Sequence, residues 1–183
     1  MIFNRLARLS IAILALIVSI AISVVSGAPK SKVLTIFQMD NPFFRTYFCL
    51  LLPTYSSRVE VKPELAVSYC NFDFYDQTVY DYDDFARFIW SVHYYKDPRG
   101  KFVQVTGHFD RKVFGLRADR GGQYHDMNVP GARCENYPYF VQFLEPRTGA
   151  FCLRCCQSRG DCRTNQFYRG CAKAMPGDYA YKF

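Results

Sequence analysis

Five of the eight cysteines fall within the twenty residues from Cys152 to Cys171. Clustered thiols can bind zinc, carry out redox chemistry or form structural disulfides. The pair Cys152-x-x-Cys155 has the spacing of a zinc or redox motif, but eight residues separate Cys162 from Cys171, where zinc ribbons usually repeat the short spacing. No βαβ pattern surrounds the pair, as a thioredoxin-like motif requires. The spacing therefore favours structural disulfides over zinc binding and redox catalysis.

The N-terminus predicts an oxidising environment for these thiols. Arg5 and Arg8 precede an apolar run from Leu9 to Val25, and small residues at 25–27 suit signal peptidase. We expect a signal peptide at 1–27 and a secreted, extracellular protein without stable membrane association after cleavage. An uncleaved membrane anchor is the alternative. Residues 28–183 then form a single cysteine-rich domain, with residues 152–183 as its disulfide-dense C-terminal part.

An even number of cysteines allows every thiol to pair. Because five lie in the cluster and three lie outside it, at least one disulfide must join the cluster to the rest of the domain. We expect Cys49 to pair with Cys70, Cys134 to pair with a cluster cysteine, and the remaining four to pair within the cluster. The predicted disulfide cysteines are Cys49, Cys70, Cys134, Cys152, Cys155, Cys156, Cys162 and Cys171.

The sequence contains no catalytic triad motif, zinc-protease motif or phosphate-binding glycine loop. His93 and His108 fall in predicted regular structure, which favours structural roles. His125 lies beside Asp126 in a glycine-rich loop, a more site-like setting. A metal-free ribonuclease would use His108 and His125 with Arg117 or Arg120, although their spacing is not distinctive. We therefore expect no catalytic residues, no metal and no cofactor, so that the protein is not an enzyme.

Basic charge is concentrated in the second half of the chain. Residues 28–98 contain 7 Lys and Arg against 9 Asp and Glu, whereas residues 99–183 contain 14 against 7. The tripeptide Arg159-Gly160-Asp161 can act as an adhesion ligand, but it also arises by chance. Nucleic acid is not an expected partner, because no basic run or recognised binding motif accompanies the charge. The candidate binding surface consists of Arg154, Arg159, Arg163 and Arg169.

The elements that must position these residues are mainly extended. Strands are predicted at 33–39, 46–52, 101–109, 112–118, 139–145 and 150–155, with a long loop at 119–138 that is exposed or pinned by Cys134. A helix is predicted at 81–95, where Phe85, Phe88, Ile89 and Val92 share one face. The expected fold is α+β, with a mainly antiparallel sheet, one principal helix and disulfides in a single domain.

The pattern Cys152-x-x-Cys155-Cys156-x5-Cys162-x8-Cys171, followed by Pro176-Gly177-Asp178-Tyr179, resembles small secreted cysteine-rich proteins of basidiomycete fungi. With the signal peptide, the chain is similar to plant-induced effectors of smut fungi, including the maize-induced Mig class. This resemblance implies a non-enzymatic, host-induced virulence effector that binds a host protein or wall component during colonisation.

Two alternatives remain open. Tyr47-Phe48-Cys49 resembles the aromatic-x-Cys motif of mildew effectors with ribonuclease-like folds, which would imply a protein that acts on nucleic acid. Inhibition of a host extracellular enzyme is the other alternative, as a special case of an interaction protein.

Overall fold

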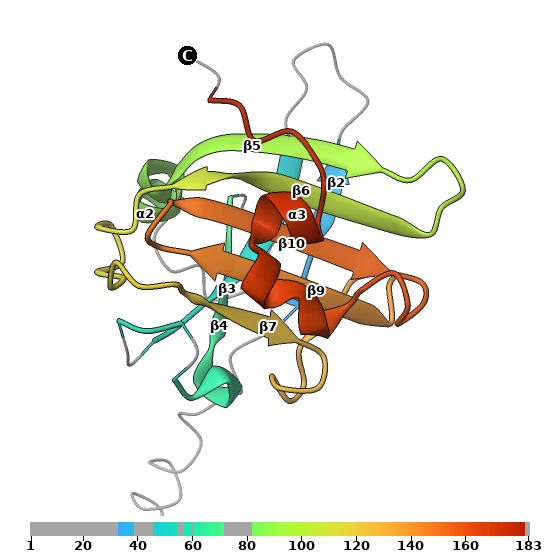
Figure 1. Ribbon diagram of the computed structural model, residues 1–183, viewed down its shortest axis with the longest axis horizontal. Helices are drawn as coiled ribbons and strands as arrows, with labels where there is room; N and C mark the ends of the chain where they lie inside the picture. The colour runs from blue at the N-terminus through green and yellow to red at the C-terminus, as the bar shows by residue number, and fades with distance from the viewer. Residues whose placement is uncertain (1–32, 39–45, 55–56, 60, 72–81, 182–183) are drawn as a thin grey trace, which may run out of the picture. The chain divides into compact units, whose positions relative to one another are not determined.

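The computed structural model describes residues 33–38, 46–54, 57–59, 61–71 and 82–181, which form one compact body (Figure 1). The predicted signal peptide lies outside these residues. No helix in the described ranges is long and apolar enough to cross a membrane. The elements are β1 (Val33–Leu34), β2 (Ile36–Gln38), β3 (Thr46–Leu52), η1 (Pro63–Leu65), β4 (Val67–Cys70), α2 (Tyr82–Phe88), β5 (Ile89–Lys96), β6 (Phe102–Phe109), β7 (Gly122–His125), β8 (Arg133–Cys134), β9 (Tyr139–Glu145), β10 (Ala150–Cys156), η2 (Thr164–Arg169) and α3 (Cys171–Ala174).

The main sheet has the strand order β5-β6-β10-β9-β7, and all neighbouring strands are antiparallel. The predicted hairpin at 139–145 and 150–155 is confirmed as β9 and β10. Gly149 in its turn has a φ of 70°, a conformation that glycine adopts without steric cost. On β10, Phe151 and Leu153 pack into the larger core, while Cys152 packs on the opposite face. The mainly antiparallel fold class is confirmed.

The predicted helix at 81–95 is wrong beyond Phe88. The chain leaves α2 and continues directly as β5, which places His93 on a strand. Phe85 and Phe88 are fully buried, whereas Val92 packs against the core as a strand residue. Residues 89–95 are rich in β-branched and aromatic side chains, and pairing with β6 satisfies their backbone groups. This pairing outweighs the helical periodicity.

The predicted strand at 112–118 is also wrong. These residues form turns, with Gly115 at a φ of 60°. Strand β6 already pairs with β5 on one side and β10 on the other, so it has no free edge for a further strand. The predicted loop at 119–138 contains the short strands β7 and β8 and is pinned by Cys134, as expected.

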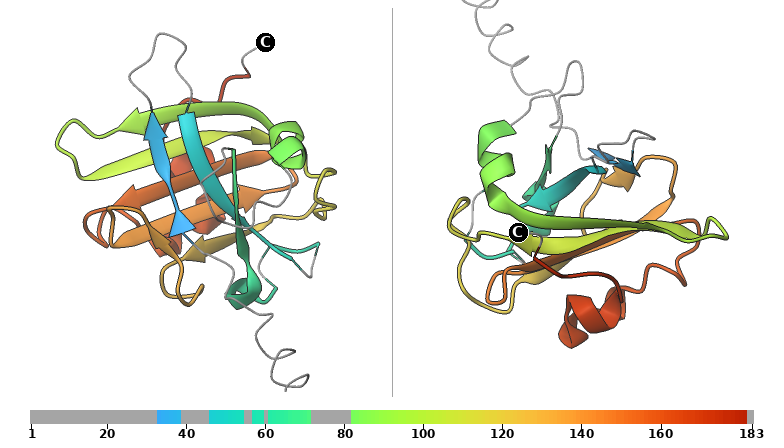
Figure 2. Two further views of the ribbon diagram at one scale, coloured as in Figure 1. Left: turned by 180° about the vertical axis from the view of Figure 1, so that it is seen from behind. Right: turned by 90° about the horizontal axis from the view of Figure 1, so that it is seen from above.

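A smaller antiparallel sheet of β2, β3 and β4 covers the inner face of the main sheet (Figure 2). The Phe48 and Phe151 rings stack between the two sheets, with their centroids 5.6 Å apart. The buried Gln142 amide donates to the Leu51 carbonyl at 2.7 Å and accepts from the Leu51 N–H at 2.8 Å. The predicted strands at 33–39 and 46–52 are confirmed, because β2 pairs with β3. This layer leaves the opposite, outer face of the main sheet for other contacts.

All eight cysteines form disulfides with the predicted distribution. One disulfide joins β3 to β4, one joins β8 to β10 and two connect β10 to the chain that follows it. The pairs are Cys49–Cys70, Cys134–Cys155, Cys152–Cys171 and Cys156–Cys162.

Candidate functional site

Side chains on the outer face of the main sheet lie in rows across the strands, because neighbouring strands are paired in register. One row runs through His125, Val141, Arg154, Gln104 and Tyr95, on β7, β9, β10, β6 and β5. Alternation along each strand places these side chains opposite the core-facing residues. Arg154 therefore lies on the central strand of the sheet, between the polar Gln104 on β6 and the apolar Val141 on β9.

Residues 157–175, here called the C-terminal module, cover part of this outer face. In Figure 1 the helices η2 and α3 lie in front of β9 and β10, and Figure 2 shows them on the side of the main sheet opposite β2 and β3. Phe167 meets Phe143 edge-on, with their ring centroids 5.4 Å apart. The Cys152–Cys171 and Cys156–Cys162 disulfides attach the module to β10. The module is thus fixed by covalent bonds over a small apolar cluster.

Residues 176–181, here called the C-terminal strap, continue across β6 and β5. The Thr106 hydroxyl donates to the Asp178 carbonyl at 2.6 Å. The His93 ring lies between two oxygens, with Nδ1 2.9 Å from an Asp178 carboxylate oxygen and Nε2 2.7 Å from the Ala180 carbonyl. The Tyr181 ring stacks on His108, with their centroids 4.2 Å apart. Both histidines therefore serve to hold the strap on the sheet.

A pocket of about 250 Å³, here called the C-terminal pocket, opens at the C-terminal module. Three of the four predicted surface arginines, Arg154, Arg163 and Arg169, line it. Lys173 on α3 is a further cationic lining residue, and Asp161 supplies the carboxylate. The structure therefore brings most of the predicted surface together, from three different elements of the module and sheet.

Arg154 is oriented by three contacts at the base of this pocket. Its Nε and Nη2 atoms donate to Gln104 Oε1 at 2.9 and 2.7 Å, and Nη1 donates to the Asp161 carbonyl at 3.2 Å. The guanidinium also lies over the Phe102 ring, 4.1 Å from its centroid. Burial lowers the pKa of Arg154, but a guanidinium starts so high that it remains charged.

Arg163 and Arg169 each donate one hydrogen bond to the part of the protein that the structure describes. Arg163 Nε donates to the Gly160 carbonyl at 3.3 Å, and Arg169 Nη1 donates to Gln166 Oε1 at 3.0 Å. A guanidinium has five N–H donors, so most donors of both residues remain available for a ligand.

Arg159 lies outside the C-terminal pocket. Its Nη2 atom pairs with Asp126 at 2.9 Å, and its guanidinium lies 4.7 Å from the Tyr139 ring centroid. In the same tripeptide, the Asp161 carboxylate accepts a hydrogen bond from Ser158 at 2.7 Å. The Arg159-Gly160-Asp161 loop thus uses both of its charged groups in contacts within the protein.

The three histidines do not form one cluster. His125 is buried, and its Nδ1 atom accepts from the Met127 N–H at 3.2 Å. Burial lowers the pKa of His125, and Arg159 adds to this effect while Asp126 opposes it. His125 on β7 and His108 on β6 have two strands between them, so the two residues are about 14 Å apart across the sheet. They are also about 13 Å apart along the strand direction.

The ribonuclease alternative requires an acid and a base on either side of one phosphate. His108 and His125 are too far apart to flank a space of that size. Arg117 and Arg120 lie in the loop before β7 and line a different hollow. In the ranges that the structure covers, no three His, Cys, Asp or Glu side chains gather closely enough to hold a metal ion.

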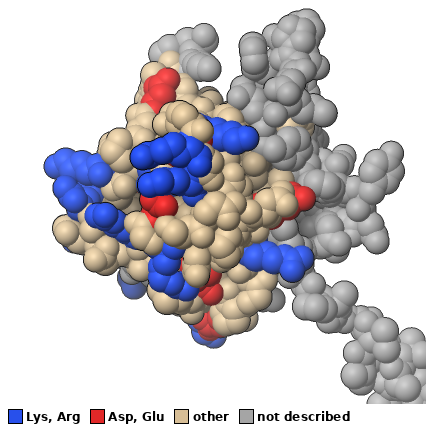
Figure 3. Space-filling view, turned by 90° about the vertical axis from the view of Figure 1, so that its right-hand side faces the viewer, with Lys and Arg blue, Asp and Glu red and all other residues tan. Residues whose placement is uncertain are grey.

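Basic side chains also gather at the end of the main sheet that carries the 97–101 and 157–163 loops, which Figure 3 views directly. Lys96, Arg99 and Lys101 are exposed there. The buried Asp97 accepts hydrogen bonds from the Arg99 and Lys101 N–H groups through its carboxylate, and so holds the turn in shape. The Gln157 N–H donates to the Lys101 carbonyl at 2.8 Å, so the two loops lie side by side at this end of the sheet.

The sequence does not predict the parts played by Gln104, Lys173 and the strap. Gln104 could have been found by period-two alternation along 101–109, which places it on the face opposite Val103 and Val105. Lys173 follows Cys171 by two residues, and its place depends on the Cys152–Cys171 pairing.

No protein-family model, curated protein or solved structure matches this chain.

Proposed function

We propose that the protein is a secreted binding protein whose C-terminal pocket receives an acidic group of an extracellular partner protein. The observation that carries this proposal is the convergence of Arg154, Arg163, Arg169 and Lys173 on one pocket, where Asp161 is the one carboxylate among the described lining residues. Guanidinium groups pair with carboxylates and phosphates in a planar, two-point geometry, so such a pocket favours an acidic side chain or chain terminus.

The protein's own contacts prepare the pocket for binding. Arg154 is held by Gln104 and by the Asp161 carbonyl before any ligand arrives. Ordering a long side chain on binding costs about 0.5–1.5 kcal/mol, and a side chain that is already ordered avoids much of this cost. The Cys152–Cys171 disulfide holds the opposite wall in place. These features support a rigid, persistent binding surface.

The resemblance to smut effectors supports a partner encountered during host colonisation. Four disulfides suit a protein that must persist in an oxidising extracellular space. We therefore place the partner among host extracellular proteins, and inhibition of a host enzyme is one form that binding would take. A panel of extracellular hydrolases and peroxidases, assayed with and without the protein, tests that form directly.

Affinity capture from host extracellular fluid tests the proposal. The bait is the secreted protein, accepted only if its intact mass rises by about 8 Da on reduction, as four disulfides require. The double variant Arg163→Glu/Arg169→Glu should lose a partner that the wild type retains. Lys112→Glu, at an exposed position outside the pocket, is the matched control and should retain it. Capture that survives the double variant would rule out the C-terminal pocket as the binding surface.

A further inference from the structure

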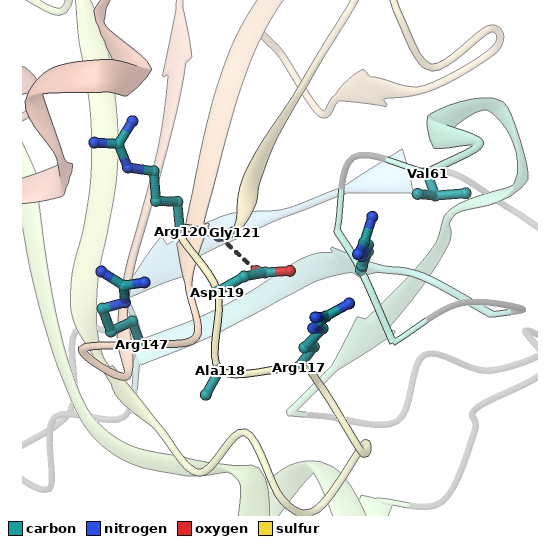
Figure 4. A pocket seen from close by; sticks show the side chains of 8 residues that line it. Val61, Arg117, Ala118, Asp119, Arg120, Gly121 and Arg147 are labelled. Atoms are coloured by element: carbon teal, nitrogen blue, oxygen red, sulfur yellow. Dashed lines mark hydrogen bonds between the residues drawn. The ribbon is translucent and has the colours of Figure 1, made fainter.

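A second basic concavity lies away from the C-terminal pocket and shares no lining residue with it. This feature, here called the arginine hollow, has a volume of about 540 Å³. Its cationic lining comes from Arg58, Arg117, Arg120 and Arg147, which belong to three separate segments of the chain. Figure 4 shows Arg120 and Arg147 on one side and Arg117 on the other, with the Asp119 side chain between them.

Backbone hydrogen bonds hold these segments together. The Arg117 N–H donates to the Ser57 carbonyl at 2.7 Å, and the Arg147 N–H donates to the Asp119 carbonyl at 3.0 Å. Gly121 has a φ of 80°, and a Cβ atom there would overlap the Leu144 carbonyl oxygen. A glycine is therefore required where the loop meets β9. The arginines are mounted on a fixed backbone, although their side chains are exposed.

Three arginines of the hollow differ from the predicted surface arginines in their hydrogen bonding. Across the described residues, no acceptor is found for the guanidinium groups of Arg117, Arg120 and Arg147, while each of the four predicted surface arginines donates to a protein oxygen. Asp119 is the one carboxylate among the described lining residues, and its Oδ1 atom accepts from the Gly121 N–H at 2.8 Å. The hollow thus has several uncommitted cations and a carboxylate whose second oxygen can accept a hydrogen bond.

This arrangement suits a ligand with separated negative groups and hydroxyls between them. Cations on two sides can each pair with one anionic group, while Asp119 repels an anion at the centre and accepts from a hydroxyl. Among the residues that the structure describes, the apolar lining consists of Val61 and Ala118, and none of the lining residues offers an aromatic ring on which a nucleobase could stack. We propose that the arginine hollow binds an acidic oligosaccharide, with its carboxylates on the arginines and a hydroxyl on Asp119.

Titration calorimetry of the fully oxidised secreted protein tests this proposal with three probes. These are an oligogalacturonate, a neutral oligogalactan and single-stranded polythymidylate. The oligogalacturonate should bind in a salt-dependent manner, and it should bind more tightly than either of the other two. Equal or tighter binding of polythymidylate would show that the hollow recognises negative charge alone, and this result would overturn the proposal. A lack of oligogalacturonate binding would also overturn it.

Variants then locate the site. Arg117→Gln and Arg147→Gln should each weaken oligogalacturonate binding about ten- to a hundredfold, the loss expected for a hydrogen bond to a charged group. Arg147→Lys should recover part of the loss, because lysine keeps the charge but not the planar two-point geometry. Arg99→Gln, which removes an exposed arginine outside the hollow, should change nothing. If Arg99→Gln weakens binding as much as Arg147→Gln does, the hollow is not the site.

The two proposals fail independently. The Arg163→Glu/Arg169→Glu variant should bind oligogalacturonate as the wild type does, because neither residue lines the hollow. The Arg147→Gln variant should likewise retain the captured partner protein. A loss of both ligands in either variant would contradict the assignment of two separate sites.

Discussion

Removing the Cys152–Cys171 disulfide should release the C-terminal module while the main sheet stays folded. The two cysteines are 19 residues apart, and closing such a ring restricts the unfolded chain by about 3 kcal/mol in the loop-entropy model. The Cys156–Cys162 disulfide holds only the start of the module, and residues 164–175 are otherwise attached mainly by the Phe143–Phe167 contact and a small cluster around Met175. The double variant Cys152→Ala/Cys171→Ala should therefore ease opening of the module by about 3 kcal/mol, or about a hundredfold.

Hydrogen exchange followed by mass spectrometry measures this opening segment by segment. Peptides that cover 164–175 should exchange about a hundredfold faster in the variant, whereas peptides from β6 should keep their protection. The matched control is Cys49→Ala/Cys70→Ala, which opens a ring of similar separation, 21 residues, between β3 and β4. Unchanged exchange in the module, or an equal loss of protection in β6, would refute the view that this disulfide acts locally.

The same variant links stability to binding. Opening the module carries Arg169 and Lys173 away from Arg154, so partner capture should fall in parallel with protection at 164–175. Oligogalacturonate binding should persist, because the arginine hollow is formed by loops that do not include the module.

Three further outcomes follow from individual side chains. Burial raises the pKa of Glu145, against hydrogen bonds from the Cys171 backbone and Thr148, so the folded state binds this proton more tightly than the unfolded chain does. The free energy of unfolding should then fall as pH rises from about 4 towards the raised pKa, and Glu145→Gln should remove that fall in urea titrations. Burial, and secondarily the nearby His93, lowers the pKa of His108, so stability should instead decline as pH falls below about 6.5; His108→Gln should lessen this decline in the same titrations. Gly121→Ala should cost more than about 1 kcal/mol in chemical denaturation, because it combines a positive φ with a backbone clash, whereas Gly115→Ala has the positive φ without the clash and should cost less.

Local sequence signals predicted the parts of the fold that depend on neighbouring residues. The β9–β10 hairpin follows from two apolar runs on either side of a turn with Pro146 and Gly149, and both strands form. The disulfide distribution follows from parity and from the position of Cys134 outside the cluster. The prediction of a helix at 81–95 fails from residue 89 onward, because β6, which is distant in the sequence, pairs with residues 89–95 as a strand and satisfies their backbone groups. Helical spacing of Phe88 and Val92 carries no information about that partner.

The same distinction explains what was predicted of the candidate sites. Arg154, Arg163 and Arg169 lie close together in the sequence and inside one disulfide-bonded segment, so their clustering could be expected. The arginine hollow assembles Arg58 with Arg117 and Arg147, and nothing in the spacing of these residues indicates that they meet. Their meeting depends on long-range hydrogen bonds such as that from the Arg117 N–H to Ser57.

Composition also does not distinguish an arginine whose hydrogen bonds stabilise the fold from one whose donors are available to a ligand. Arg154 is half-buried and gives three donors to Gln104 and Asp161, so removing it would leave Gln104 Oε1 without its charged donor inside the protein. Arg147 is exposed, and within the described ranges its guanidinium has no acceptor, so its removal leaves no group unpaired. Loss of binding in an Arg154 variant could therefore come either from lower stability of the fold or from the loss of a direct contact with the ligand. The hollow offers the cleaner measurement, because binding there can change while the fold does not.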